Sequence, residues 1–202
     1  TNGSTTITPT AYSFNQTSGF SVVKYTGNTT SGAKVAHGLG ATPTCIMTKN
    51  LNSAENWFVY FVTTTNGKYL KLDATASTVT SATAWNDTDP DSVNVTLGNS
   101  AQTNGTSMVA YCFAPKKGFS QFGKYEGVGN VDGPFIYTSF RPAWVLIKNS
   151  YGSEAWNIWD TKRNPSNLTN KNIQPDASSA QNTATAPSGQ VIDILSNGFK
   201  IR

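Results

Sequence analysis

An internal repeat constrains this chain more than any other feature of its sequence. The stretch PTCIMTKNLNSAENWFVY at 43–60 returns as PAWVLIKNSYGSEAWNIWD at 142–160. A proline, a Lys-Asn pair and a tryptophan recur at a constant offset of 99 positions, so that Trp57 matches Trp156. A repeat of this length predicts two units of one design in series.

The repeat also predicts where the units begin and end. GFS at 19–21 returns at 118–120, which extends the match beyond the central stretch. We therefore divide the 202 residues into a lead-in at 1–18, a first unit at 19–115 and a second unit at 116–202. Each unit is large enough to bury a core of its own. Residues 1–10 are polar and have no periodicity, so we interpret the lead-in as a linker, in which 11–14 is a candidate short strand.

The composition and the apolar pattern predict the fold class. Charged residues make up only 13% of the chain, and Thr, Ser, Asn and Gly take their place. This mixture favours short strands and turns over exposed helices. No helical apolar period persists for three turns, whereas short alternating segments recur throughout. We predict an all-β protein made of two tandem β-sandwich units.

The two units differ at their C-terminal ends. The first continues from Leu97 through a loop into SMVAYCF at 107–113, whereas the second runs from Leu195 to FKIR at 199–202. The second unit thus has no counterpart of SMVAYCF within this sequence. We expect it to lack its last strand and to leave an open sheet edge. That strand would come from polypeptide beyond Arg202 or from a neighbouring subunit.

The run WFVYFVT at 57–63 carries bulky apolar side chains on both faces of a strand. Such a strand is covered twice, once by its own sandwich core and once by the sister unit or another subunit. The second copy carries tryptophans in the corresponding region. We predict core or interface positions for six aromatic residues: Trp57, Tyr60, Phe61, Trp144, Trp156 and Trp159.

Trp85, Asn86 and Asp87 form a separate candidate site in the segment TAWND. A tryptophan among small polar residues is typical of sugar sites, where the ring stacks and amide or carboxylate groups bond hydroxyls. These three residues are therefore our candidate ligand-binding set. The alternative interpretation is that Trp85 packs between the two units.

His37 is the single histidine, so a catalytic triad based on histidine or a multi-histidine metal site cannot form within one chain. It lies before glycine at the end of a short predicted strand. We interpret it as a turn histidine that bonds backbone groups. The alternative is a threefold assembly that places three copies of His37 around a metal.

The acidic residues do not predict a reaction centre. Asp87, Asp89 and Asp91 have the spacing of a calcium loop, but the glycine and glutamate that such a loop requires are missing. We interpret them as a solvated acidic turn. No local pair of carboxylates, phosphate-binding loop or nucleophile motif is present. We therefore predict no enzymatic activity, no metal site and no cofactor.

Three further features bear on the environment and the partners of the chain. Cys45 and Cys112 both fall in the first unit and have no counterparts in the second, so we interpret them as free thiols in the core. The formal net charge of +4 is spread along the chain. Without a basic stripe, nucleic acid is not an expected partner. No apolar run reaches the length of a membrane span, and we predict no membrane insertion.

An ordered set of motifs carries a resemblance to a known family. The motifs are GFSVVKYTGN, TAWNDT, VAYCFAPKKGFSQFGKYEGVGNVDGPFIYTSFRPAWVLIKN and ILSNGFKIR, and they span residues 19–202. This set resembles the duplicated β-rich domain of virion proteins from marine tailed phages, cyanobacterial phages in particular. The resemblance implies a tail fibre or other structural protein, and it assigns no catalytic or binding residues.

We therefore expect a phage virion structural protein, located on the extracellular particle. Its role would be that of an appendage module, in a tail fibre, spike or head fibre, that assembles with other virion proteins. A glycan or protein of the host cell surface is the expected external partner, and a homotrimer the expected oligomer. Two alternatives remain: a capsid decoration or cement protein, and a carbohydrate-binding module of a secreted protein.

Overall fold

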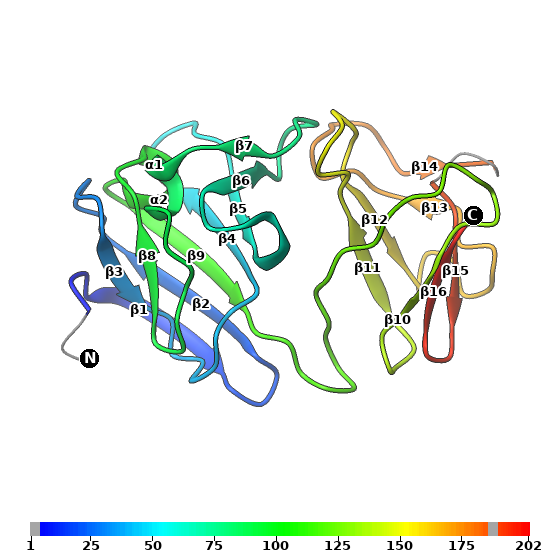
Figure 1. The fold of residues 1–202 in the computed structure, drawn as a ribbon, viewed down its shortest axis with the longest axis horizontal. Helices are drawn as coiled ribbons and strands as arrows, with labels where there is room; N and C mark the ends of the chain where they lie inside the picture. Colours follow the sequence, from blue (N-terminus) through cyan, green and yellow to red (C-terminus); the bar gives the residue numbers. More distant parts are fainter. Residues whose placement is uncertain (1–4, 186–189) are drawn as a thin grey trace.

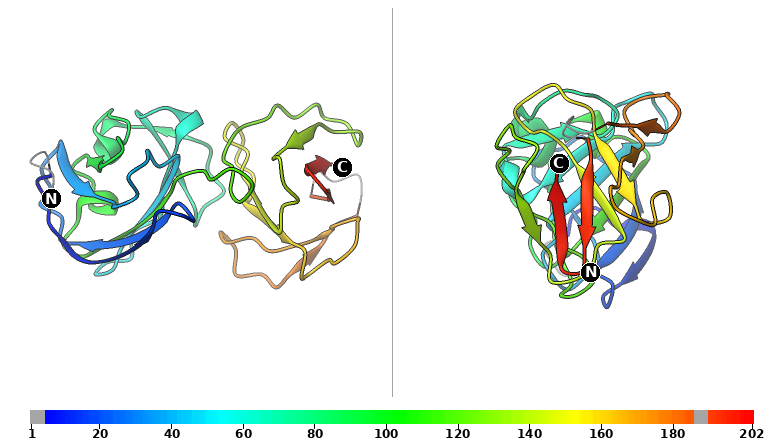
Figure 2. Two further views of the ribbon diagram at one scale, coloured as in Figure 1. Left: turned by 90° about the horizontal axis from the view of Figure 1, so that it is seen from below. Right: turned by 90° about the vertical axis from the view of Figure 1, so that its right-hand side faces the viewer.

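The computed structural model describes residues 5–185 and 190–202 of the chain. It confirms the all-β class, because helical structure in the described residues is limited to α1 (Ala82–Trp85), α2 (Ala101–Asn104) and the 3-10 turn η1 (Val62–Thr64). The strands β1–β9 form one lobe and β10–β16 form the other (Figure 1). The chain crosses between the lobes through residues 114–134 (Figure 2).

The first unit is built on a seven-stranded sheet. In spatial order its strands are β1 (Pro9–Asn15), β2 (Phe20–Tyr25), β9 (Met108–Phe113), β4 (Cys45–Asn50), β5 (Phe58–Phe61), β6 (Lys68–Lys71) and β7 (Val79–Thr80). β9 comes last in the sequence but is central in the sheet, because it pairs antiparallel with both β2 and β4. β3 (Ala33–Ala36) and β8 (Asn94–Leu97) pair as a second layer.

The first core lies between these two layers and beneath the short helices. Tyr25, Tyr60 and Trp85 are among its largest buried side chains. Ser81 begins α1 by accepting a hydrogen bond from the backbone N–H of Thr83. This cap fixes a single helical turn whose last residue, Trp85, points into the core. The unit therefore has a sandwich-like architecture, with the helices filling the gap beside the smaller layer.

The lead-in predicted as a linker belongs largely to the first unit. β1 pairs antiparallel with β2 along the edge of the main sheet, and Ile7 is buried in the first core beside Val35. The linker interpretation was wrong because six of the seven residues of β1 are exposed, so the strand shows no apolar alternation. Residues 1–4 lie outside the described residues.

The second unit contains three smaller sheets. β10 (Phe135–Tyr137), β16 (Gly198–Ile201) and β15 (Ile192–Leu195) form one, β11 (Trp144–Ile147) and β12 (Asn157–Asp160) the second, and β13 (Lys171–Asn172) and β14 (Asn182–Thr183) the third. The second core gathers Val145, Trp159, Ile192, Ile194, Phe199 and Ile201. This unit is thus less regular than the first.

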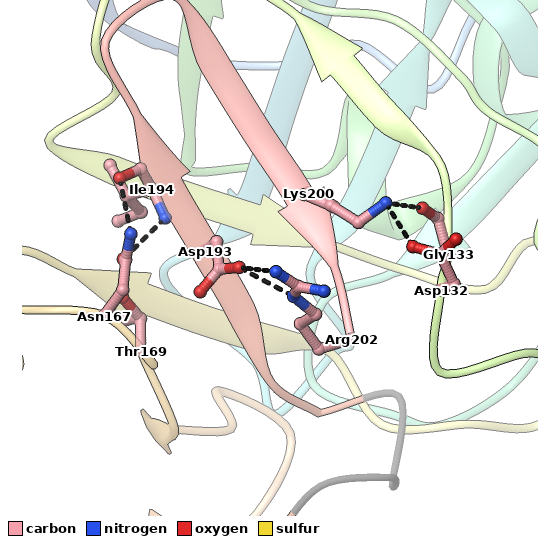
Figure 3. A network of polar contacts seen from close by, with 8 residues as sticks. All are labelled: Asp132, Gly133, Asn167, Thr169, Asp193, Ile194, Lys200 and Arg202. Atoms are coloured by element: carbon pink, nitrogen blue, oxygen red, sulfur yellow. Dashed lines mark hydrogen bonds and ion pairs between the residues drawn. The ribbon is translucent and has the colours of Figure 1, made fainter.

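The β15–β16 hairpin is held by polar contacts (Figure 3). The guanidinium of Arg202 bonds the buried carboxylate of Asp193 at 2.6 Å. On the other side of the hairpin, Lys200 pairs with Asp132 at 2.7 Å. The side-chain amide of Asn167 accepts a hydrogen bond from Ile194 N–H and donates one to the carbonyl oxygen of the same residue. These contacts anchor both strands of the hairpin.

The two units match in one hairpin and differ elsewhere. β11 and β12 start 99 positions after β4 and β5 with the same register, since Cys45 faces Phe61 and Trp144 faces Asp160. The segment 119–125, which corresponds to β2 in the repeat, forms no strand. Among the described residues no strand pairs with the second edge of β11, as the missing counterpart of 107–113 led us to expect.

Candidate binding groove between the two units

An apolar cluster joins the two units, and we call it the interface cluster. The first unit contributes Cys45, Met47, Val59, Phe61, Leu70, Leu72 and Phe113, and the second contributes Phe122, Leu146 and Trp156. The strand β5 is consequently covered on both faces. Phe58 and Tyr60 pack in the first core, whereas Val59 and Phe61 pack in the interface cluster. Burial of apolar surface here stabilises the contact by about 25 cal/mol per Å².

Polar contacts fix the orientation of this interface. The indole N–H of buried Trp156 donates to the carbonyl oxygen of Lys71 at 2.7 Å, which satisfies the single donor of the ring. The ammonium group of Lys148 donates to the carbonyl oxygen of Thr75 at 2.9 Å. The backbone N–H of Thr78 donates to the carbonyl oxygen of Ser150 at 3.1 Å. The second unit is therefore tied to the β6–β7 region of the first.

Beside the interface cluster lies a groove, which we call the β11 groove. Residues 119–127 and 142–151 of the second unit line it, together with residues of β4, β5 and β6 in the first unit. Its volume is about 1620 Å³, which exceeds the ~300–1,000 Å³ of ordinary small-molecule pockets. Phe119 and Trp144 are largely exposed within it. The size and apolar lining fit a polypeptide segment better than a small ligand.

The repeated polar residues stabilise one hairpin loop in each unit, and the loop of the second unit borders this groove. Lys49 donates from its ammonium to the carbonyl oxygen of Glu55, and Lys148 makes the same contact with Glu154 at 2.7 Å. Asn149 accepts two backbone N–H groups of its own loop at 2.9 Å. The Lys-Asn…Glu pattern of the repeat is therefore a loop clamp, used once in each unit.

The two repeated tryptophans make the same kind of backbone hydrogen bond to an aspartate. The backbone N–H of Trp57 donates to the carboxylate of Asp73 at 3.2 Å, and that of Trp156 donates to Asp176 at 3.2 Å. Desolvation lowers the pKa of the Lys148 ammonium nearby, while the charges of Asp176 and Glu154 oppose this shift. The carboxylates thus hold backbone and a partly buried cation in place.

The six aromatic residues predicted at core or interface positions occupy several environments. Tyr60 and Trp159 are buried in the two cores, whereas Trp156 and Phe61 contribute to the interface cluster. Trp57 is half-buried. Its ring stacks on that of Tyr111 with a centroid distance of 5.9 Å.

Trp144 departs from that prediction because 55% of its surface is exposed. It lies at the open edge of β11, where the corresponding Cys45 in the first unit is covered by β9. Apart from the missing last strand, nothing in the sequence indicates that Trp144 is exposed.

The candidate ligand set at Trp85 is contradicted by its position. Trp85 is only 1% exposed and packs edge-to-face on Tyr60 within the first core, so it offers no ring face to a sugar. It does not pack between the units either. Asn86 ends α1 in the left-handed conformation, and Asp87 follows it as an exposed residue. Small neighbours surround Trp85 because they form one tight helical turn against the sheet.

His37 bonds backbone at a turn, as the sequence indicated. It is buried, and its Nδ1 accepts the N–H of Leu39 at 3.2 Å. Its Nε2 therefore carries the proton and donates to the carbonyl oxygen of Asp91 at 3.1 Å. Desolvation lowers the pKa of His37, and its contacts with Asp91 only partly oppose this effect. The ring is neutral at neutral pH.

The acidic turn also serves the fold. Asp89 accepts a hydrogen bond from the hydroxyl of Tyr60 at 2.9 Å. Asp91 accepts the backbone N–H groups of Val93 and Asn94, both at 2.7 Å. Within residues 5–185 and 190–202, no group of three or more His, Cys, Asp or Glu side chains is placed to hold a metal ion.

Cys45 and Cys112 are free and buried, which confirms that the two cysteines do not form a disulfide. Cys112 lies in the first core and Cys45 in the interface cluster. Desolvation raises the pKa of each thiol to about 12. Both are therefore protonated at neutral pH and act as small apolar side chains.

Comparison with known proteins places the chain in a family. Residues 1–202 match the family described as a domain of unknown function, DUF7483, and the chain belongs to it. No curated protein and no solved structure matches the chain. Among the helices in the described ranges, none has the length and apolar character needed to cross a membrane.

Proposed function

We propose that this member of the DUF7483 family is a structural module of a phage virion that sits in an appendage and carries no reaction centre. One observation supports this role above the others. Four polar side chains that attract a chemical interpretation, those of His37, Asp89, Asp91 and Lys148, each make contacts that hold turns, loops or the unit interface. The ordered phage-type motifs of residues 19–202 supply the connection to a virion.

The surface of the first unit supports a role in assembly. Tyr12 and Phe14 on β1 are exposed and stack on each other with a centroid distance of 5.8 Å. β1 is also the outermost strand of its sheet, so one of its edges carries unpaired backbone groups. Exposed aromatic side chains beside a free edge are typical of contact surfaces between proteins. We propose that this surface contacts other copies, in a homotrimer, or other virion proteins.

Labelling of intact virions tests the proposed location. Antibody fragments raised against the purified chain, imaged on particles by electron microscopy, should decorate the tail or its fibres. Decoration of the capsid shell would replace the appendage role with that of a decoration protein. Absence of the chain from purified particles, measured by mass spectrometry, would reject a virion role altogether.

Sedimentation tests the proposed assembly surface. The parent chain should sediment as a trimer at tens of micromolar, and the double variant Tyr12→Ser and Phe14→Ser should shift it towards monomer. Tyr151→Ser is the matched control, because Tyr151 is 92% exposed but lies on the second unit, away from β1. A parent that sediments only as a monomer would contradict the homotrimer.

Binding to intact host cells tests the proposed attachment. Fluorescently labelled chain should bind susceptible cells more strongly than cells of a resistant strain. Equal binding to both would contradict a role in host recognition while leaving the assembly role in place.

A further inference from the structure

The edges of the sheets show where a second polypeptide can pair with this chain. The edge strands β1, with the sequence PTAYSFN, and β11, with the sequence WVLI, contain no charged residue. Charged side chains, prolines and bulges normally protect an edge from pairing with other chains. Pro9 and the register shift that follows it protect only one end of β1. Residues 11–15 and 144–147 therefore lack such protection.

The other edges of the first unit are covered by neighbouring segments of the described chain. On β3, the segment 6–7 bonds both the N–H and the C=O group of Lys34. On β8, Asp91 bonds both the N–H and the C=O group of Asn94. β7 has only two residues, and the backbone beside it bonds the second unit.

The second unit covers its other edges in the same way. On β15, Thr169 exchanges two backbone hydrogen bonds with Ile192, and the side chain of Asn167 bonds Ile194 (Figure 3). The side-chain amide of Gln121 donates to the last carbonyl oxygen of β10. β12 bridges to the segment after β13, and β14 has only two residues. Among the described strands longer than two residues, β1 and β11 are thus the ones with a fully uncovered edge.

The ladder pattern shows which backbone groups of β1 are unpaired. Ala114 donates its N–H to the carbonyl oxygen of Gly19, so these residues form a hydrogen-bonded pair that continues the β2–β9 ladder. By alternation the even-numbered residues of β2 direct their N–H and C=O groups towards β1, and the carbonyl oxygen of Lys24 indeed accepts a bond from β1 at 3.2 Å. Their partners are the odd-numbered residues of β1. Tyr12 and Phe14 therefore direct their N–H and C=O groups to the open edge.

The same pattern applies to β11. Thr161 donates its N–H to the carbonyl oxygen of Ala143, so this pair is hydrogen-bonded on the β12 side. Alternation then directs the backbone groups of Val145 towards β12 and those of Trp144 and Leu146 into the β11 groove. Each open edge thus offers two residues, spaced two apart, whose N–H and C=O groups lack a strand partner.

These two edges match in one antiparallel register. With Tyr12 opposite Leu146 and Phe14 opposite Trp144, both pairs exchange two hydrogen bonds. Directly opposite residues share a face, so all four side chains lie on the side of the interface cluster, to which Leu146 belongs. The pairing covers three aromatic rings that are exposed in the single chain, since the exposed fractions of Tyr12, Phe14 and Trp144 are 67%, 47% and 55%.

We propose that β1 of a second copy of this chain occupies the β11 groove, antiparallel to β11 and in this register. Within one copy β1 is held in its own sheet by β2, so the strand comes from another molecule. The inference rests on the assembly surface proposed above for β1 and identifies its partner. Because the contact joins two different surfaces, it repeats head to tail and closes a ring of three in a homotrimer.

The surroundings of the two edges favour this pairing over pairing of either strand with itself. The β11 groove is lined by the second unit and by β4, β5 and β6 of the first, so a strand within it is covered on both faces. Six of the seven residues of β1 are exposed, so β1 can enter such a groove. Two paired copies of β1 would leave these residues exposed, and two copies of β11 would bring the linings of both grooves to the same place.

Mixing of two edge variants tests the proposal by sedimentation. Tyr12→Pro and Trp144→Pro each remove an unpaired N–H at an open edge, where proline is tolerated, so both should melt close to the parent. Each variant alone should associate at least about tenfold more weakly than the parent. An equimolar mixture should form a 1:1 complex, because one variant keeps β11 intact and the other keeps β1 intact. Tyr137→Ser, on the edge strand β10 and 60% exposed in the parent, is the control and should associate like the parent.

Hydrogen exchange of the parent tests the register without any substitution. The amides of Tyr12, Phe14, Trp144 and Leu146 should exchange at least about tenfold more slowly in the assembled protein than after dilution to monomer. The amide of Ser13, which already bonds β2, is the internal reference and should change little. Equal exchange of the four amides in the two states would overturn the proposal.

The sedimentation results separate this proposal from the proposed function. Undiminished association of Tyr12→Pro would mean that β11 pairs with itself or that another surface is used. Undiminished association of Trp144→Pro would overturn the β11 groove as the partner, while the assembly surface on β1 would stand. Two weakened variants that do not combine would also overturn the proposal. A parent that stays monomeric at tens of micromolar would overturn it together with the homotrimer, whereas labelling and mass spectrometry of virions decide the virion role independently.

Discussion

At the scale of single residues, the polar groups of this protein act on backbone. His37 bonds the main chain with both ring nitrogens, and the lysine of each repeat bonds a carbonyl oxygen in its own loop. The repeat could be recognised from sequence because these contacts require the same residue types at the same spacing. The burial of Trp85 could not be recognised from sequence, because it depends on how the single helical turn of α1 packs against strands that are distant in the sequence.

We expect stability to fall as the pH drops below about 6.5, the ordinary pKa of an unfolded histidine. Burial lowers the pKa of His37 in the folded chain, so the unfolded chain takes up the proton first. The full contribution is present above pH 6.5. Urea unfolding followed between pH 7.5 and pH 5 measures this, and His37→Gln should flatten the profile. A parent profile that is already flat would contradict the buried neutral ring.

The cysteines should be unreactive in the folded chain. Burial raises the pKa of both thiols to about 12, so neither forms thiolate at pH 8. A colorimetric thiol reagent should label neither Cys45 nor Cys112 in buffer and both in denaturant. In the Cys45→Ala variant only the thiol of Cys112 remains, so comparing its labelling rate with that of the parent shows which of the two thiols reacts more slowly. Rapid labelling of the native chain would show that the interface cluster opens.

At the scale of elements, strands in which apolar and polar residues alternate strongly could be predicted, whereas strands with weak alternation were harder to recognise. β4, β5 and their counterparts β11 and β12 lie where the repeat placed strands. β1 was anticipated only at residues 11–14, because almost all of its residues are exposed and the strand shows no apolar alternation. The segment 119–125 (FSQFGKY) resembles β2 (FSVVKY) in sequence but has no neighbouring strand to pair with, so it forms no strand.

The β15–β16 hairpin should depend on one of its two ion pairs. Arg202→Ala leaves the buried Asp193 carboxylate without its charged partner and should cost about 1–2 kcal/mol, less than a fully buried pair because the guanidinium is partly exposed. Lys200→Ala is the control, since its partner Asp132 is exposed and Tm should stay close to that of the parent. Thermal unfolding measures both. Equal losses would show that Asp193 has no special role.

At the scale of the whole molecule, the two units share an apolar interface that the double-faced strand of the sequence anticipated in part. The bulky apolar side chains of Val59 and Phe61 indicated that the second face of β5 packs against another element. From the sequence, this element was either the sister unit or another chain. The structure places Trp156 and Phe122 of the second unit there. The sequence could not distinguish the sister unit from another chain as the packing partner, because either partner requires the same apolar surface on β5.

Trp156→Ala should destabilise the chain by about 3–5 kcal/mol and separate the unfolding of the two units, because it removes a buried ring and its bond to Lys71. Trp144→Ala, in the same unit but exposed, should cost much less. Differential scanning calorimetry distinguishes one transition from two. A single unshifted transition in Trp156→Ala would mean that the interface cluster does not couple the units.

The central position of β9 determines the order in which this protein forms during translation. β2 and β4 cannot join into one sheet until residue 113 has left the ribosome, because β9 is the strand that links them. Until then the nascent chain carries two separate β-rich pieces with unpaired edges. Phe113, the last residue of β9, then completes the interface cluster in which Trp156 packs, so the N-terminal unit serves as the template for its successor.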